Sequence, residues 1–550
     1  MNINSFLRKK NISDLQNENH SSQLNKILNL KDLTFFGIAA IIGAGIFSTI
    51  GRASYEGGPA VSMLFLFVAI ACIFTALCYA QFASMIPVSG SAYTYTYVSL
   101  GEIFAWTIGW ALILEYAVSN IVISISWSGY FVSMLQGFGI HWPEWLAVDY
   151  WNAHQAFLAQ QAHETLTNND IKLAEVYKSA PSFGGIKVLF NLPAGLITLF
   201  VTILAYIGIK ESTKVSNALV WIKLVVIVGI ILIGAFYVKP DNWTPFLPNG
   251  FEGVMGGVAA VFFSFIGFDS ISTTAEECKN PRRDLPRAMI LCIIICTVLY
   301  AAIALVLTGM VNYKELRVDD PLAYVFDKIG MNFIAGIISV SAVIAMTGAI
   351  LVYQVGQPRI WMTMSRDGLL WKPFSKIHKK YHTPSFSTII AGVFVAIPAM
   401  FIDMQVVVDL TSVGTFFAFI LVCSGVLFLD YKGYSKQAKF KLPYINGKYI
   451  ICPLFIIAMY VFLFQVDGLK MLNDKPLLYV FWLVWLGLGI GSLKYQFSLL
   501  PILGILFNLY LMTELGWSNW IMFIVWLVIG LTIYFLYGRK NSKLNQIFNS

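Results

Sequence analysis

The chain is a succession of apolar stretches, each about 20 residues long, that are separated by short polar joints. A stretch of this length crosses a bilayer core when it coils into a helix. Between Leu33 and Tyr537 the pattern predicts about fourteen spanning helices. Twelve spans remain the alternative, because the short joints of the last four stretches can hide a re-entrant segment. Those four stretches are 449–465, 476–492, 499–515 and 520–537.

The amino-acid composition also indicates a membrane protein. Hydrophobic residues make up 58% of the chain and charged residues 12%, and the mean hydropathy is +0.71. These values exceed those of soluble globular proteins, so we expect an all-α polytopic membrane protein. The segment before the first apolar stretch is polar, and that stretch is long enough to stay in the membrane, so no cleavable signal is expected.

The distribution of Lys and Arg predicts the orientation. Placing both termini in the cytoplasm puts most of these residues on the inner side, as the positive-inside rule requires. The net charge of +8 then reflects topology and needs no nucleic-acid partner, and a basic inner face also suits contact with anionic lipids. The residues placed inside include Arg8, Lys9, Lys10, Lys279, Arg282, Arg283, Arg287, Arg366, Lys372, Lys376, Lys379, Lys380, Lys432, Lys436, Lys439, Lys441 and Lys448.

Two apolar stretches are interrupted near their middles, the first within 41–47 and the sixth within 263–268. A helix broken at that depth is tolerated only where the freed backbone groups face protein or a wet cavity. One Gly-x-Gly more often serves close helix packing. Breaks at corresponding places in two halves of a chain are instead typical of secondary transporters, in which half-helix N-termini face an anion and freed carbonyls face a cation. An α-amino acid carries both charges.

The side chains that mark enzymes and metal sites are not apparent in the pattern. The seven cysteines lie in predicted spans or, for Cys278, beside one, so we expect reduced thiols and no disulfide framework. The histidines fall outside the spans, and no Cys/His spacing resembles a zinc site. We therefore expect no metal and no other cofactor. An enzyme is the least favoured class, because no nucleophile–base pair is visible.

Four groups of residues carry a family resemblance. They are Ile42–Phe47, Cys78–Ser84 running into Pro87–Tyr95, Gly267–Pro286, and Gln357–Ile360 with Arg366–Leu370. Together they resemble the bacterial relatives of cationic amino acid transporters, within the amino acid-polyamine-organocation (APC) superfamily. Gln81 departs from the pattern, because relatives often carry Glu there, and this puts an inner-gating role of that carboxylate in doubt.

The resemblance implies a LeuT-like fold in the bacterial inner membrane. Five helices are followed by an inverted repeat of five more and by accessory C-terminal helices, and the first helix of each repeat is broken. The external insertion at 137–187 is not explained by the family pattern, and we assign it no function. The implied divisions are a cytoplasmic tail at 1–31, the repeats at 32–237 and 238–430, accessory helices at 431–538 and a second cytoplasmic tail at 539–550.

The resemblance also implies a substrate site built from main-chain atoms. The substrate carboxylate would rest on N–H groups of the first break, and the α-amine would meet carbonyls of both breaks. Independently of the family, amides at a helix start bind anions wherever glycine permits close approach. The expected amides are those of Gly43, Ala44 and Gly45, and the expected carbonyl positions are Ile42, Phe263, Ser264 and Ile266.

Two side chains are expected to shape this site. Phe268 either closes over the substrate or is an ordinary core aromatic. Met346 lies where relatives border the side-chain pocket, and a bulky thioether there would favour smaller apolar amino acids over arginine.

Lys223 is the only cation that the pattern places inside a span. A central lysine costs about 2.5–3.5 kcal/mol, so it should face a polar partner in the bundle or lose its proton. Either outcome suits proton coupling. The resemblance implies that Lys223 fills the space that sodium occupies in sodium-driven relatives. Alternatively, its side chain reaches the inner interface as a structural anchor.

Glu115, in the third predicted span, is the only carboxylate that the pattern places well inside the membrane. We expect it to pair with Lys223. The resemblance implies a position near the pocket, where Glu115 serves a proton relay or substrate selectivity. The alternative is a buried, hydrogen-bonded carboxylic acid.

These observations predict a proton-coupled importer of small or medium apolar or neutral amino acids that works by alternating access. Its partners would be the amino acid, protons and membrane lipid. A proton-independent exchanger of amino acids or amines is the main alternative, and a non-transporting nutrient receptor is a third. The sequence leaves the particular amino acid, the stoichiometry and the oligomeric state open.

Overall fold

The computed structural model describes residues 8–10, 28–43, 45–86, 88, 90–163, 168–207, 212–318, 320–381, 383–434, 438–464 and 468–549. Within these residues the chain is almost entirely helical. The described strands are β1 (Ser182–Phe183) and β2 (Ile186–Lys187), which pair antiparallel. The expected all-α polytopic membrane protein is confirmed.

The helices form three consecutive groups. The first is α2 (Leu30–Ile41), η2 (Gly45–Thr49), α3 (Ile50–Gly57), η3 (Gly58–Ala60), α4 (Val61–Met85), α5 (Ser91–Ser99), α6 (Glu102–Gly137), α9 (Leu192–Ile207) and α10 (Ser212–Ala235). The second is α11 (Gly250–Gly256), α12 (Val258–Phe263), η6 (Phe268–Glu277), α13 (Pro281–Met310), α14 (Pro321–Lys328), α15 (Asn332–Arg366), α16 (Ser385–Phe401) and α17 (Met404–Tyr431). The third is α18 (Lys448–Phe464), α19 (Gly468–Asp474), α20 (Leu477–Tyr495), α21 (Leu499–Thr513), α22 (Trp517–Ile533), η10 (Tyr534–Gly538), α23 (Arg539–Asn541) and α24 (Lys543–Asn549).

The order of elements agrees with a repeated unit. Each of the first two groups opens on an interrupted helix, and a short helix, α5 or α14, precedes its third long one. Among the described residues, eight helical segments are long and apolar enough to cross a membrane, and five shorter helices of 10–17 residues are also apolar. The segment Gly45–Met85 makes two passes, because the chain turns at Gly58, where φ is +61°. With α2 completing the first pass and the five shorter helices counted as spans, the described helices are compatible with the expected fourteen spans.

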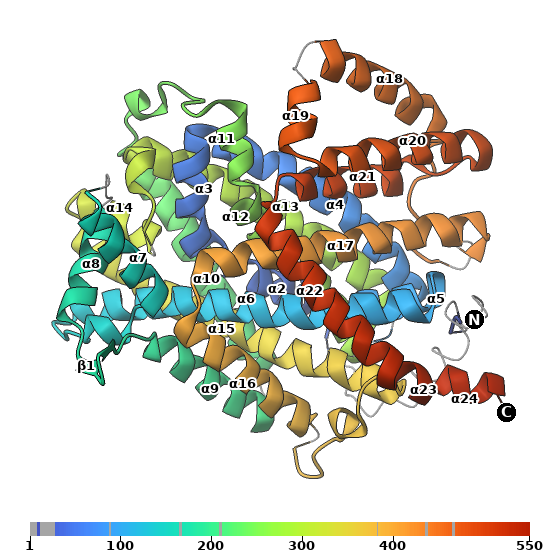
Figure 1. Ribbon diagram of the computed structural model, residues 1–550, viewed down its shortest axis with the longest axis horizontal. Coiled ribbons are helices and arrows are strands. Elements are labelled where there is room, and N and C mark those ends of the chain that lie inside the picture. The colour runs from blue at the N-terminus through green and yellow to red at the C-terminus, as the bar shows by residue number, and fades with distance from the viewer. Residues whose placement is uncertain are drawn as a thin grey trace.

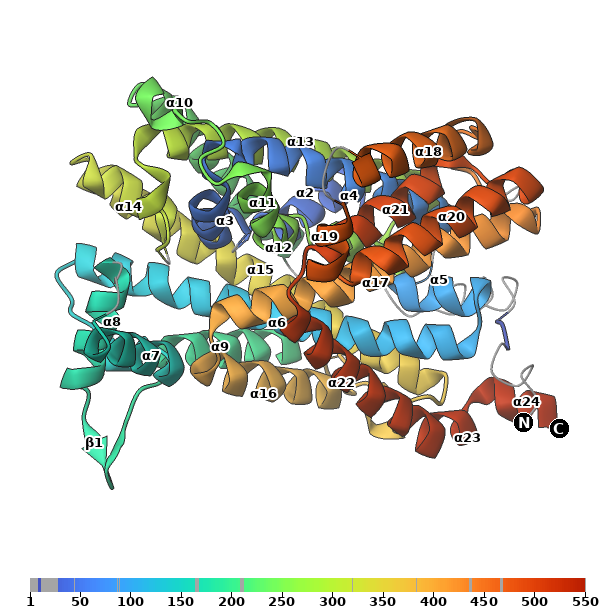
Figure 2. The ribbon, with the colours of Figure 1, turned by 45° about the horizontal axis from the view of Figure 1, so that its top comes forward.

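The two interrupted helices meet in the middle of the bundle (Figure 1). α12 packs on η2 and α3, and α2 packs on η6. The long helices α6 and α15 pack along one another beside them. Figure 2 shows α18, α20 and α21 grouped beside α17, on one side of this core. The core helices therefore surround the two breaks, and the accessory helices lie outside them.

The two ends of the bundle differ. The end that carries α7 (Tyr150–Gln161), α8 (Asn168–Ser179) and the β1–β2 hairpin is called the insertion end below, and the opposite end, where both chain termini lie, is the terminal end (Figure 1). The third group of helices returns to the core at the terminal end. There the buried Glu102 carboxylate accepts hydrogen bonds from Tyr97 at 3.0 Å and Tyr534 at 2.9 Å.

A reciprocal pair of indole hydrogen bonds fastens α22 to α6. Trp110 Nε1 donates to Trp526 O at 2.7 Å, and Trp526 Nε1 donates to Trp110 O at 3.0 Å. The two rings stack with centroids 4.6 Å apart. A buried indole N–H needs such a partner, so this pair fixes the position of the last accessory helix.

We predict that Trp526→Phe lowers the free energy of unfolding by about 1 kcal/mol, because it removes one of the two bonds. The measurement is the midpoint of thermal unfolding in detergent, followed by dye labelling of the buried cysteines. Trp520→Phe is the matched control, since its indole nitrogen, on the same helix, has no hydrogen-bond partner among the residues that the structure describes. Equal midpoints for the two variants would contradict this role.

Candidate functional site

The first break begins where α2 ends at Ile41. The Gly43 amide turns back to Ile41 O at 3.0 Å, and helical structure resumes at Gly45. Ala44, one of the expected carboxylate-binding positions, lies outside the described residues. A five-residue π-helical segment follows, and α3 then carries the chain onward. The expected interruption of the first span is therefore present.

The second break follows Phe263, where α12 ends. A turn leads to Gly267, whose φ is +114°, and the chain continues as a 3-10 helix from Phe268. A Cβ on Gly267 would lie 2.8 Å from the Tyr353 hydroxyl and 3.0 Å from Ala40 Cβ. Glycine is needed here both for its backbone angle and for the approach of the two breaks.

The two interrupted helices touch at backbone level. A Cβ on Gly45 would lie 2.4 Å from Ser264 Cα. Thr49 Oγ1 donates to Gly45 O at 2.9 Å or to Ala260 O at 3.1 Å, so one hydroxyl serves both helices. The described expected positions of the site, Ile42, Gly43, Gly45, Phe263, Ser264 and Ile266, are brought together and are all buried.

Lys223 supports the first break. Its side chain, 1% exposed, extends from α10 and donates to Ile42 O at 3.2 Å and Ala39 O at 3.4 Å. Carbonyls at a helix C-terminus carry partial negative charge, so they are a suitable partner for an ammonium group. The alternative in which Lys223 reaches the membrane interface as an anchor is wrong, because its amine is inside the bundle.

Tyrosines hold three more carbonyls of the breaks. Tyr300 donates to Ile41 O at 2.9 Å and Tyr353 donates to Ile266 O at 3.2 Å. Tyr130 donates to Phe47 O. These tyrosines were not predicted from the sequence. The signal available was a tyrosine within an apolar span, since a buried hydroxyl requires a partner.

Glu115 is buried on α6, and neither of its oxygens accepts a hydrogen bond among the described residues. It interacts electrostatically with Asp269 on η6, which is also 1% exposed. The expectation that Glu115 is the only carboxylate well inside the membrane is therefore wrong. The bonds of Lys223 go to main-chain carbonyls, so the structure does not show the expected Glu115–Lys223 pair.

The two expected pocket side chains have different surroundings. The Phe268 ring packs against Tyr79 and Phe419, with centroids 5.9 and 5.2 Å away, so in this structure it is part of an aromatic core. Met346 is buried on α15. One turn further along the same face, the Ala349 Cβ would lie 3.1 Å from a Cβ on Gly43. Met346 is thus on the face that meets the first break, and its role in selectivity stays a prediction.

Comparison with known proteins identifies the family. The amino acid permease model matches residues 28–488, and a model of the C-terminus of these permeases matches 498–542. The chain belongs to the amino acid permease family.

Similar members of the family are known transporters. This permease is 39% identical to the branched-chain amino acid permease BcaP of Bacillus subtilis, over 98% of this chain and 99% of that protein. It is 35% identical to the methylthioribose transporter of the same organism, over 99% and 100%. It is 31% identical to the vacuolar cationic amino acid transporter 4 of Arabidopsis thaliana, over 99% and 97%.

The motifs that suggested the family meet at the terminal end of the permease. Glu277, from the motif after the second break, forms an ion pair with Arg359 at 2.9 Å. Tyr93 donates to Asp367 at 2.7 Å, and Lys10 from the N-terminal segment bonds the same carboxylate at 2.6 Å. These motifs are distant in sequence, yet together they close the terminal end beneath the two breaks.

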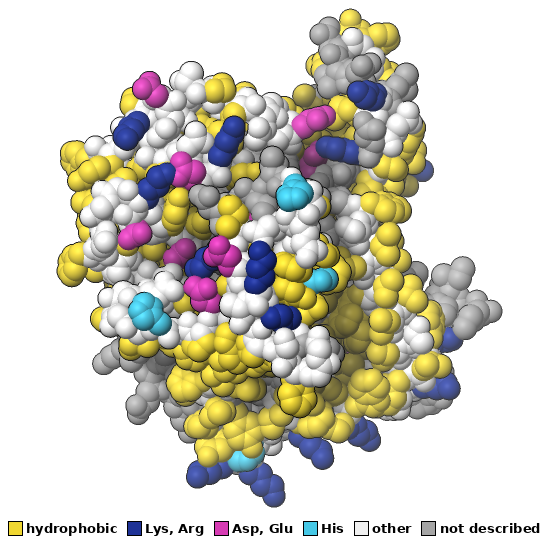
Figure 3. Space-filling model, turned by 60° about the vertical axis from the view of Figure 1, so that its left-hand side comes forward, with side chains coloured by type: hydrophobic (Ala, Val, Ile, Leu, Met, Phe, Trp, Pro, Cys, Tyr) yellow, Lys and Arg dark blue, Asp and Glu magenta, His cyan; other side chains and the backbone are white. Residues whose placement is uncertain are grey.

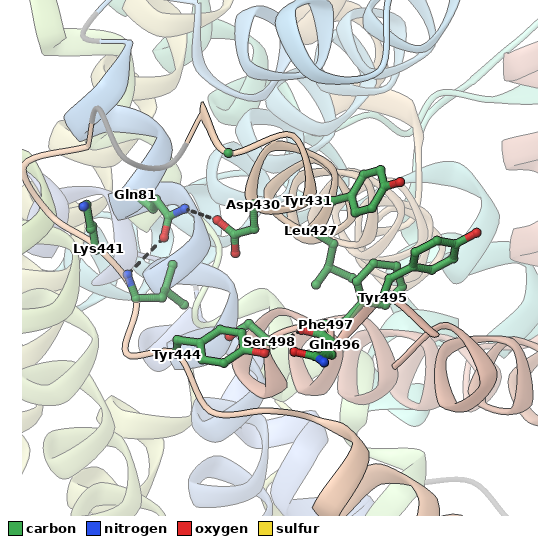
Figure 4. Close-up of a pocket in the computed structure, with 12 residues that line it drawn as sticks. Gln81, Leu427, Asp430, Tyr431, Lys441, Tyr444, Tyr495, Gln496, Phe497 and Ser498 are labelled. Carbon is green, nitrogen blue, oxygen red and sulfur yellow. Dashed lines mark hydrogen bonds between the residues drawn. The ribbon is translucent and has the colours of Figure 1, made fainter. Parts of the chain in front are cut away.

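Gln81 departs from the family pattern, and both its amide nitrogen and its amide oxygen have a hydrogen-bond partner. Its amide donates to Asp430 Oδ1 at 3.0 Å, and its carbonyl accepts from Leu442 N at 3.0 Å (Figure 4). These groups line a cavity of about 400 Å³ at the terminal end, between α4, α17 and the accessory helices. An ionised glutamate at position 81 would have no N–H group to donate to the Asp430 carboxylate, whereas the glutamine amide does. Gln81 and Asp430 are therefore a complementary donor–acceptor pair.

We predict that Gly45→Ala lowers both the unfolding midpoint and the affinity for substrate, because the added methyl group meets the main chain of Ser264. Overpacking of this kind typically costs about 1–3 kcal/mol. Ligand-induced shifts of the midpoint report the affinity. The control is Gly229→Ala, where a Cβ meets open space. Native-like binding by Gly45→Ala would contradict the close contact of the two breaks.

We also predict that Gln81→Glu destabilises the permease by about 1–3 kcal/mol, because it places two carboxylates at hydrogen-bonding distance. Adding Asp430→Asn should restore the unfolding midpoint, since the amide and carboxylate then exchange sides. If the double variant were as unstable as Gln81→Glu alone, the pairing would not explain why glutamine stands here.

Proposed function

We propose that this permease is a proton-coupled importer of small or medium apolar or neutral amino acids that works by alternating access. The observation that carries the proposal is the bond from the Lys223 ammonium to Ile42 O in the first break. A titratable group thereby contacts the same backbone segment that is proposed to hold the substrate. Protonation and substrate occupancy can then influence one another directly.

The proposed substrate site uses main-chain atoms of both breaks. The carboxylate would be bound by amides at Gly43, Ala44 and Gly45, and the ammonium by carbonyls of Ile42 and of the second break. A carbonyl oxygen has two lone pairs, so Ile42 O can accept from Lys223 and from the substrate together. The second-break carbonyl positions are Phe263, Ser264 and Ile266.

The proposed coupling depends on the charge of Lys223. In its protonated form this side chain draws the end of α2 toward α10 through two carbonyls. Loss of the proton removes the attraction between a cation and the negative end of the helix, and leaves α2 free to move. Glu115 and Asp269 are a second proton-binding site on the adjoining elements, and we propose them as a relay.

The proposed substrate class rests on Met346 and on the relatives. A bulky thioether beside the first break would favour a small or medium apolar side chain. The relatives are named for branched-chain amino acids, for methylthioribose and for cationic amino acids. All three relatives are named as permeases or transporters, but the substrates in their names differ. We therefore propose only the class of substrate.

We propose that the terminal end faces the bacterial cytoplasm. Lys10, Lys279 and Arg359 all lie there, close to the N-terminal segment. The positive-inside rule then places the insertion outside. The basic inner face would also contact anionic lipids.

We predict that Lys223→Met abolishes accumulation driven by a pH gradient in empty proteoliposomes. Without the ammonium group, the carbonyls of α2 lose their charged partner and the proton loses its site. Initial uptake of labelled leucine is measured with and without an imposed gradient, and Lys239→Met, an exposed lysine, is the control. Gradient-insensitive uptake that the substitution leaves unchanged would remove the coupling hypothesis, and uptake that requires internal amino acid would identify an exchanger.

We further predict that Met346→Ser raises the uptake of larger amino acids relative to alanine, because a smaller side chain enlarges the pocket. A competition panel against labelled alanine measures the change, and Met63→Ser, on an exposed side chain, is the control. An unchanged substrate range would show that the selectivity wall has been misplaced.

A further inference from the structure

The cavity beside Gln81 has no part in the proposed transport cycle. Its volume of about 400 Å³ is within the range of small-molecule sites. Its walls come from α4, from the end of α17 and the segment that follows it, and from the turn between α20 and α21. Tyr431, Tyr444 and Tyr495 line it and are exposed at the terminal end. Exposed tyrosines are typical of the interface between membrane and water.

Hydrogen bonds fix the shape of this cavity. Leu499 N donates to Ile445 O at 2.8 Å, and the Tyr444 hydroxyl donates to Gln496 O at 2.8 Å. The segment after α17 is therefore held against the turn that precedes α21. The cavity is thus a built feature that joins the second repeat to the accessory helices.

Ser498 lines the cavity immediately before α21. The residue is 4% exposed, yet its hydroxyl has no hydrogen-bond partner among the described residues. It does not cap α21, although capping is the usual role of a serine at this position. A buried hydroxyl requires a partner, and the positive end of a helix dipole favours an anionic one. Ser498 therefore indicates an anion at the start of α21.

The surroundings of the cavity are basic. Residues 431–448 contain five lysines and no acidic residue, and Lys441 is exposed where it lines the cavity. Among the described lining residues Asp430 is the only carboxylate, and its Oδ1 accepts from Gln81 (Figure 4). The side that carries the insertion differs, because acidic and basic side chains are interspersed there (Figure 3). An excess of positive charge favours an anionic ligand at the terminal end.

An apolar strip leads away from the cavity along α20. Leu486, Ile490 and Leu493 are exposed and lie on one face of this helix, since four and three residues separate them. α20 ends at Tyr495, in the wall of the cavity, so the strip begins beside the cavity. From there it runs along the spanning helix. A soluble anion has no use for such a strip, whereas the acyl chains of a lipid would lie along it.

We propose that this cavity binds the phosphate head group of an anionic phospholipid from the cytoplasmic leaflet. The phosphate accepts a hydrogen bond from the Ser498 hydroxyl at the start of α21, and the nearby lysines attract its charge. The acyl chains lie along the apolar strip of α20. The inference goes beyond the proposed transport function and uses only the proposed orientation of the terminal end.

The test is native mass spectrometry of the full-length protein in detergent, after its bound lipid has been removed. Dioctanoyl phosphatidylglycerol is the probe. Phosphatidylcholine with the same chains tests whether charge is recognised, and glycerol 3-phosphate tests for a free phosphate compound. We expect saturable binding of phosphatidylglycerol, about tenfold tighter than binding of the other two. Its binding should also raise the unfolding midpoint.

Two variants test the lining residues. Ser498→Ala removes the hydroxyl without removing a cap bond, and Lys441→Gln removes one exposed charge. Each should weaken phosphatidylglycerol binding about fivefold to tenfold. Because Lys441 is exposed, its variant tests the site even if Ser498→Ala lowers stability.

Ser341→Ala and Lys376→Gln are the matched controls, and neither residue lines the cavity. Ser341 is another buried serine whose hydroxyl has no partner in the described part of the chain, and Lys376 is another exposed lysine. Both controls should bind phosphatidylglycerol as tightly as the native protein.

Three results would overturn the proposal. In the first, the cavity variants bind phosphatidylglycerol as tightly as their controls do. In the second, phosphatidylcholine binds equally well, which would show that the charge is not recognised. In the third, glycerol 3-phosphate binds as tightly and depends on Ser498, which would identify a site for a soluble phosphate compound. Lipid binding is measured without transport, so failure of the proposed function would leave these outcomes unchanged.

Discussion

The interaction on which the rest of the structure depends is the ammonium group of Lys223 against the carbonyls that end α2. Inside a membrane each unpaired carbonyl costs several kcal/mol, so a helix cannot stop there without replacement donors. Lys223 supplies two of them, to Ile42 and Ala39. Tyr300 supplies another, to Ile41, and Tyr353 does the same for Ile266 in the second break. The break is therefore a built feature that the surrounding helices maintain.

In the proposed substrate site, the main-chain atoms freed at the breaks would bind the substrate. Main-chain polar atoms are freed at both breaks, and glycine at positions 45 and 267 lets the two interrupted helices touch. Recognition of the common head group then leaves the side-chain pocket to determine specificity. At the terminal end, hydrogen bonds join the family motifs to one another, through Tyr93 and Asp367, and join the C-terminal segment to the core, through Ser542 and Glu102. At the insertion end, a cavity lined by charged side chains reaches Ser48, in the helical segment that follows the first break.

The sequence was sufficient to predict the class of fold, both breaks and the buried lysine, because each depends on a local pattern. Glycines within apolar runs and one lysine in a span are visible without knowing what surrounds them. The neighbours of Glu115 were not predictable in the same way. Asp269 follows the second break directly, and its depth depends on how the chain turns at Gly267.

The remaining features depend on contacts between segments distant in sequence. The bond from Gln81 to Asp430 joins helices of different repeats, and Asn152 reaches Asp403 from the insertion. No periodicity in either segment encodes such a pairing. The insertion, which the family pattern did not explain, packs around a small apolar cluster, because side chains of α7, of α8 and of the segment after α8 meet only when these helices pack.

The most direct test of the central claim is a cryo-electron microscopy map of the protein saturated with an amino acid that it transports. The account predicts ligand density between the amides at Gly43 and Gly45 and the carbonyls that follow Phe263, with the amine of Lys223 still on Ile42 O. Continuous helices through both segments, or a central ligand held by side chains alone without main-chain contacts, would contradict it.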